Sequence, residues 1–153
     1  MNRRALLKST LGASVITVAA AAGLLLPGRV LAAYPKEAFS AKDVSSAVSG
    51  ALGAANPQQT DQIEIKAPDI AENGSVVPVT ISTDMTNVES ISIFAESNGT
   101  PLVAVFNLTA ADAFVSTRIK MGKTGNVVAV VKSGGKLYSN SKEVKVTIGG
   151  CGG

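Results

Sequence analysis

The chain contains no histidine, no tryptophan and a single cysteine among its 153 residues. Without histidine, the Ser-His-Asp and Cys-His catalytic arrangements, histidine-ligated metals and histidine proton shuttles are all excluded. One cysteine cannot build a thiolate cluster for zinc or iron–sulfur, and neither familiar glycine-rich phosphate loop occurs. The 11 acidic residues are scattered and fit turns or solvent-facing positions. We therefore expect a protein that is not an enzyme and that holds no metal and no cofactor.

Residues 1–32 have the pattern of a signal peptide. Arg3 and Arg4 precede an uncharged stretch from Ser9 to Leu26, and Ala32 and Ala33 supply the small residues that suit a signal peptidase. Paired arginines at this position indicate the twin-arginine export route. The stretch is also long enough to be a retained membrane anchor, but its alanine and glycine content favours removal. We expect cleavage after Ala32 and a periplasmic protein.

Removal of this segment changes the charge of the protein. Four of the 14 basic residues lie in it, so 10 basic and 11 acidic residues remain, with a formal charge of −1. A role in nucleic-acid binding or in polybasic membrane binding then has no compositional support. About 120 residues are left, which is enough for one domain with its own core. We expect one domain at 33–148, with no nucleic-acid partner and no membrane association after cleavage.

One helix is predicted between Ala41 and Ala55. Ser40 is expected to be its N-cap with Asp43 as the capping acid, and Asn56-Pro57 is expected to end it. Apolar residues, most of them small, recur at helical spacing: Val44, Ala47, Val48, Ala51, Leu52 and Ala55. This stripe indicates close packing, either against the protein's own sheet or against a partner subunit.

From Ile63 onward the apolar residues alternate with a period of two, and glycine-containing turns separate the segments. The nearly all-apolar Leu102 to Leu108 is expected to be a central strand, and Pro78 indicates an edge strand or a bulge. The pattern predicts an all-β fold, an antiparallel β-sandwich with a short N-terminal helix. Strands are expected at 63–65, 77–81, 91–95, 102–108, 114–120, 127–132, 137–138 and 143–148.

The single cysteine is the third residue from the end, in the tail Gly149-Gly150-Cys151-Gly152-Gly153. Glycine's backbone freedom predicts a flexible arm at 149–153 whose thiol can enter a narrow cleft of another protein. We interpret Cys151 as a site of covalent loading. An odd cysteine in an exported protein also indicates an intermolecular disulfide, so a disulfide-linked dimer in a structural exported subunit is the alternative.

The ending KVTIGGCGG at 145–153 resembles the C-terminus of SoxY, the carrier subunit of the periplasmic thiosulfate-oxidising Sox system. The resemblance continues through APDIAENG at 67–74, VPV at 77–79, VSTRIKM at 115–121 and NVVAVV at 126–131. Ubiquitin-like sulfur carriers also end in Gly-Gly, but they are cytosolic, and the export signal argues against that reading.

The resemblance implies an immunoglobulin-like sandwich that pairs with SoxZ, with Cys151 as the carrier cysteine. It further implies that SoxAX, a c-type cytochrome, joins thiosulfate oxidatively to that sulfur. SoxB, a manganese hydrolase, would then release sulfate, and SoxCD, where present, would oxidise the remaining sulfane sulfur. The protein itself would be the carrier and the substrate of these enzymes.

A short basic run, Arg118, Lys120 and Lys123, lies near a glycine-containing loop. It could attract anionic conjugates or an acidic docking surface. A solvated strand edge is the simpler interpretation, and it is the one we expect.

Overall fold

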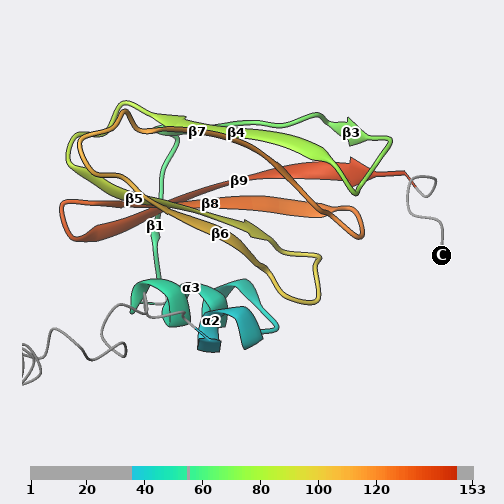
Figure 1. Cartoon of the computed structure of the whole chain (residues 1–153), viewed down its shortest axis with the longest axis horizontal. Coiled ribbons are helices and arrows are strands. Elements are labelled where there is room, and N and C mark those ends of the chain that lie inside the picture. The colour runs from blue at the N-terminus through green and yellow to red at the C-terminus, as the bar shows by residue number, and fades with distance from the viewer. Residues whose placement is uncertain (1–35, 55, 148–153) are drawn as a thin grey trace, which may run out of the picture. The chain divides into compact units, whose positions relative to one another are not determined.

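A computed structural model describes residues 36–54 and 56–147, so the signal peptide at 1–32 and the arm at 149–153 lie outside the described residues. Two sheets pack face to face, and a pair of short helices covers the outer face of the larger sheet (Figure 1). The helices are α2 (Lys36–Ser40) and α3 (Val44–Leu52). The strands are β1 (Gln58–Gln59), β2 (Ile63–Lys66), β3 (Ile70–Ala71), β4 (Val77–Thr83), β5 (Val88–Ala95), β6 (Leu102–Asn107), β7 (Phe114–Ile119), β8 (Gly125–Ser133) and β9 (Lys136–Val146).

The six-stranded sheet has the order β1-β9-β8-β5-β6, and β3 also pairs with β9. The three-stranded sheet has the order β2-β4-β7. All pairings are antiparallel except the short ones of β1 and β3, which run parallel to β9. The predicted all-β sandwich with a short N-terminal helix is confirmed, and the two parallel pairings are an addition that the sequence pattern did not predict.

The central strands of the larger sheet are apolar on both faces because both faces are covered. In β8, Val127, Ala129 and Val131 point into the core between the two sheets, whereas Val130 joins a second core beneath the helices. Successive residues of a strand point to opposite faces, so two cores require a nearly continuous apolar run. This explains the run VVAVV that the sequence shows at 127–131.

The prediction that 102–108 forms a central strand is wrong, because β6 is the edge strand of its sheet. The prediction assumed that an all-apolar strand has neighbours on both sides. In the structure, Leu102 belongs to the helix-side core, and Val103 packs against the core between the sheets. The apolar composition of β6 therefore reflects the coverage of both its faces. It does not indicate whether the strand lies at the centre or at the edge of the sheet.

The predicted helix is shorter than expected and has a different cap. Asp43 is the N-cap of α3, with its side chain accepting a hydrogen bond from the Ser46 N–H, and Ser40 instead ends α2. Gly53, with a φ of 77°, ends α3 before Asn56-Pro57 is reached. Ala47 and Val48 are buried in the helix-side core, so the small-residue stripe packs against the protein's own sheet.

Pro78 does not mark an edge strand, because it lies in β4, the central strand of the smaller sheet. The pairing of β2 with β4 reaches only Lys66 opposite Thr80, two residues short of Pro78. At Pro78 itself only β7 is paired, through Arg118. Because β4 has one neighbour at this point, the missing N–H of proline interrupts no second ladder.

The two segments predicted at 137–138 and 143–148 form one strand, β9, which pairs with β8 along its length. Its hairpin turn uses Gly134 and Gly135, whose φ angles of 54° and 75° suit glycine. As predicted, Val144 is buried and Lys145 is exposed. Ile148, also expected to point inward, lies outside the described residues.

Candidate functional site

The structure describes the strand that leads to the cysteine, up to Thr147, four residues before Cys151 in the sequence. Cys151 and the arm glycines Gly149, Gly150, Gly152 and Gly153 lie outside the described residues, so their assignment as a site remains a prediction. The described part of the candidate site is therefore the end of β9. We define this end as residues 145–147 and call it the arm root.

On one side, the arm root is held by β3. The two strands run parallel, with Ile70 opposite Lys145 and Ala71 opposite Val146. The Lys145 N–H donates to the Asp69 carbonyl at 2.9 Å, and the Thr147 N–H donates to the Ala71 carbonyl at 3.1 Å. Main-chain hydrogen bonds thus continue to the last described residue.

On the other side, beyond the last pair of the β8–β9 ladder, the side chain of Thr124 bonds to the arm root. The last paired residues of β8 and β9 are Gly125 and Val144. Beyond them, the Thr124 Oγ1 accepts a hydrogen bond from the Val146 N–H at 2.9 Å and lies 3.4 Å from the Val146 carbonyl as a donor. Thr124 therefore prolongs the ladder by one residue and fixes Val146 from the side opposite to β3.

Gly74 packs tightly beside the arm root. A Cβ added to it would collide with the Met121 carbonyl oxygen and lie 2.8 Å from the Val146 Cγ1. The Met121 N–H donates to the Gly74 carbonyl at 2.7 Å, and the Met121 side chain is fully buried. The turn that begins at Asn73 thus lies directly against the end of β9, which only a residue without a side chain allows.

The loop that carries Thr124 is itself fixed by the turn after β5. The Asn98 side chain donates to the Lys120 carbonyl at 2.7 Å and accepts from the Gly122 N–H at 3.0 Å. The Ser97 hydroxyl donates to the Lys123 carbonyl at 2.9 Å. Sequence reasoning missed these residues, because turn residues such as Asn and Ser show where a turn lies but not which distant loop they bond.

The basic run does not form a cluster with defined partners. Arg118, Lys120 and Lys123 are exposed, and none of them takes part in the ion pairs formed among residues 36–54 and 56–147. The solvated positions expected for them are confirmed.

Among the described residues, the carboxyl groups of Asp43 and Glu89 have shifted pKa values, and both support secondary structure. Hydrogen bonds from the Ser46 N–H and hydroxyl lower the pKa of Asp43. The pKa of Glu89 is lowered by Lys132, whose Nζ lies 2.8 Å from the carboxylate, and by the N–H of Gly135. Asp43 caps α3, and Glu89 ties the start of β5 to β8 and its hairpin.

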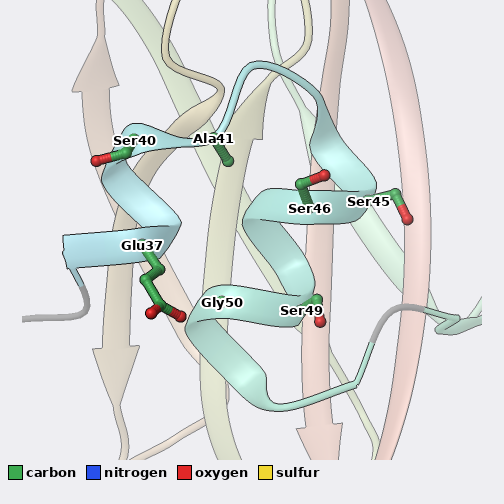
Figure 2. Close-up of a pocket in the computed structure, with 7 residues that line it drawn as sticks. All are labelled: Glu37, Ser40, Ala41, Ser45, Ser46, Ser49 and Gly50. Atoms are coloured by element: carbon green, nitrogen blue, oxygen red, sulfur yellow. The ribbon is translucent and has the colours of Figure 1, made fainter.

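A groove lies between α2 and α3 (Figure 2). Serine hydroxyls dominate its lining, but two of them are already used: Ser40 bonds to the Lys36 carbonyl and Ser46 to the Asp43 carboxylate. Because the chain has no histidine, a serine in this groove cannot form a Ser-His pair. Within the described ranges, no cluster of acidic, cysteine or histidine residues could hold a metal ion. The lining residues are Glu37, Ser40, Ala41, Ser45, Ser46, Ser49 and Gly50.

The family model for the sulfur oxidation protein SoxY matches residues 48–151. The chain belongs to the SoxY family. The solved structure of the sulfur carrier protein SoxY from Chlorobium limicola f thiosulfatophilum is 45% identical in sequence, with a TM-score of 0.63. The match covers 72% of this chain and 97% of that one. Membership of this family gives the chain a role in sulfur oxidation as a carrier protein, and it confirms the predicted immunoglobulin-like β-sandwich.

A second solved structure shows the fold alone. The superoxide reductase (neelaredoxin) from Ignicoccus hospitalis is 20% identical, with a TM-score of 0.50, and the match covers 57% of this chain and 82% of that one. No curated protein matches this chain. In the part of the chain that the structure describes, no helix has the length and apolar character needed to cross a bilayer.

Proposed function

We propose that the chain carries the sulfur intermediates of thiosulfate oxidation covalently on Cys151. The observation that carries this proposal is the arm root: β3, Thr124 and Gly74 together fix the strand that ends five residues before the only cysteine. The match to the SoxY family model, which ends at residue 151, supports the same residue.

The chemistry requires only an accessible thiolate from this chain. The Cys151 sulfur and the outer sulfur of thiosulfate form a disulfide bond, and the two electrons released pass to the c-type cytochrome of SoxAX. Water then attacks the terminal sulfonate in SoxB, so sulfate leaves and a persulfide remains on Cys151. SoxCD, where the host has it, oxidises that sulfur; otherwise another acceptor takes it. Each oxidation, acid or base step takes place in a partner enzyme, because this chain has no histidine and no cofactor motif.

The arm sets how far the sulfur reaches from the folded body. Cys151 lies four residues beyond Thr147, and four fully extended residue steps span at most about 14 Å. This distance suffices for the thiol to enter a cleft while the sandwich docks at its mouth. Because the arm glycines have no side chains, the arm is thin enough to enter the active-site cleft of each enzyme in turn.

The proposal includes the partners and the compartment. SoxZ forms a heterodimer with this chain, and SoxAX, SoxB and SoxCD dock transiently. The protein reaches the periplasm by the twin-arginine route, with the signal peptide removed after Ala32. We expect a thiol this near the C-terminus to form disulfide-linked dimers through Cys151 as well, when no partner protects it.

The test is mass spectrometry of the C-terminal peptide from cells that oxidise thiosulfate. We expect adducts of about 112 Da for a bound thiosulfate and about 32 Da for a persulfide on Cys151. In a strain that carries only Cys151→Ser, both adducts and thiosulfate consumption are lost, while the melting temperature stays unchanged because a terminal residue contributes nothing to the core. Unchanged thiosulfate consumption in that strain would contradict the proposal. A disulfide dimer without any adduct would support the structural alternative.

A further inference from the structure

The sheets have five edge strands in the described part of the chain, and four of them are protected. The strands β1 and β3 have only two residues each, β2 carries Glu64 and Lys66, and β7 carries Arg118. The fifth, β6, has six residues with the sequence LVAVFN and no charge or proline. Short length, charge and proline are the usual means by which an edge strand avoids pairing with other chains, and β6 uses none of them.

Some main-chain groups of β6 point away from the sheet, and no residue among 36–54 and 56–147 bonds to them. The Leu108 N–H donates to the Glu89 carbonyl at 2.9 Å, so Leu108 faces β5. Because hydrogen-bonding direction alternates along an antiparallel strand, Phe106 also faces β5, whereas Val105 and Asn107 turn their N–H and C=O groups outward. No hydrogen bond from the described residues reaches these outward groups. They have the geometry that another extended strand would satisfy.

The side chains of β6 define what that strand must present. Phe106 packs against the core between the sheets, and Val105 packs against the helix-side core. Four consecutive apolar residues, from Val103 to Phe106, nevertheless remain only half-buried. A strand added beside β6 would extend both cores at once. It must therefore be apolar on both faces and uncharged over about five residues.

We propose that β6 is the edge to which the partner subunit of the carrier adds a β-strand, continuing the six-stranded sheet from one protein into the other. That the partner is a second, β-rich subunit rests on the proposed function; the location on β6 rests on the structure. The small-residue stripe of α3 packs in the protein's own core. The β4 edge is open only at residues 77–79, where Pro78 has no N–H to offer an added strand. We therefore place the docking edge on β6.

Hydrogen exchange of the full chain, alone and in complex with its co-expressed partner subunit, tests the location. We expect the amides of Val105 and Asn107 to exchange at least about tenfold more slowly in the complex, because each then lies in a hydrogen-bonded ladder. The matched reference is the peptide 114–119, the edge strand of the other sheet, which should exchange equally in both samples. Protection elsewhere in a stable complex, with 102–107 unchanged, overturns the inference and leaves the carrier function intact.

A pair of variants at one position tests the main-chain pairing. Asn107 is exposed, and its N–H points away from β5, so Asn107→Pro removes an outward donor without breaking the internal ladder. We expect this variant to bind the partner about tenfold more weakly or worse, whereas Asn107→Ala, which keeps the N–H, binds as the wild type does. Val105→Lys is a second variant that places a charge on the same edge, and it should weaken binding as well. Thermal unfolding of each variant establishes that it is folded.

The remaining outcomes are also decisive. If Asn107→Pro and Val105→Lys both bind normally, β6 is not the docking edge. If 102–107 is protected in the isolated chain in proportion to its concentration, a second copy occupies the edge and the partner assignment is wrong. Because adduct formation on Cys151 is measured separately, failure of the docking proposal and failure of the carrier function are distinguished.

Discussion

The substitution Gly74→Ala should destabilise the protein and displace the arm root. The added methyl group would collide with the Met121 carbonyl and lie 2.8 Å from the Val146 Cγ1, a distance that real Cβ atoms do not show. Neither neighbour can yield easily, because Met121 is fully buried and Val146 is held by Ala71 and Thr124. Overpacking of this kind costs about 1–3 kcal/mol of unfolding free energy. For a domain of this size, a loss of 2 kcal/mol lowers the melting temperature by roughly 5–10 °C.

Gly99 supplies the matched control. It lies in the turn after β5, and a Cβ added there would have no heavy atom within 4 Å. Thermal unfolding of Gly74→Ala, Gly99→Ala and the wild type, followed by circular dichroism, compares the same chemical change at a crowded and at an open position. We expect Gly99→Ala to melt with the wild type. Equal melting temperatures for all three proteins would show that the contact of Gly74 with the arm root is not tight.

Three further predictions concern the arm and its support. Thr124→Val leaves the Val146 N–H without its acceptor and should lower the unfolding free energy by about 1 kcal/mol. Thr124→Ser keeps this hydrogen bond and should be as stable as the wild type. Equal stability of the valine and serine variants in thermal unfolding would contradict the prediction. Glu89 has a lowered pKa in the folded state, so its stabilising contribution is present above the ordinary pKa of glutamate and is lost as the pH falls through the lowered pKa. The stability difference between wild type and Glu89→Gln, measured by urea unfolding from pH 7 to pH 3, should therefore shrink; a constant difference would refute it. Valine at both Gly149 and Gly150 should leave the reaction of Cys151 with a small thiol reagent unchanged but slow its enzymatic loading; unchanged loading would show that the glycines do not serve access.

The β-strands could be predicted from the sequence because their signal is local. Alternation at 77–81 and 91–95 correctly placed Val77, Val79 and Ile93 in the core. The hairpin at Gly134 and Gly135 was equally clear, since two glycines between apolar segments permit the positive φ angles that a tight turn needs. Where one face of a strand meets one core, a period of two suffices to assign it.

The arrangement of the strands could not be read in the same way. The apolar sequence of β6 favours a central strand. Composition shows how many faces of a strand are buried, but not how many neighbouring strands it has. The start of α3 was misplaced because Ser40 and Asp43 are both good caps, and the choice depends on how α2 packs. The support of the arm root depends on Thr124 meeting Val146 across 22 positions, a contact for which the sequence holds no local sign.

The continuous strand β9 also determines how the protein responds to a pull on its C-terminus. Its 11 residues extend over about 36 Å, from the Gly134-Gly135 hairpin to the arm root. Hydrogen bonds to β8 lie perpendicular to the strand, so a force along its axis loads them in shear, all at once. A pull on the arm is therefore resisted by the β8–β9 ladder as a unit, and β9 would not peel away one hydrogen bond at a time.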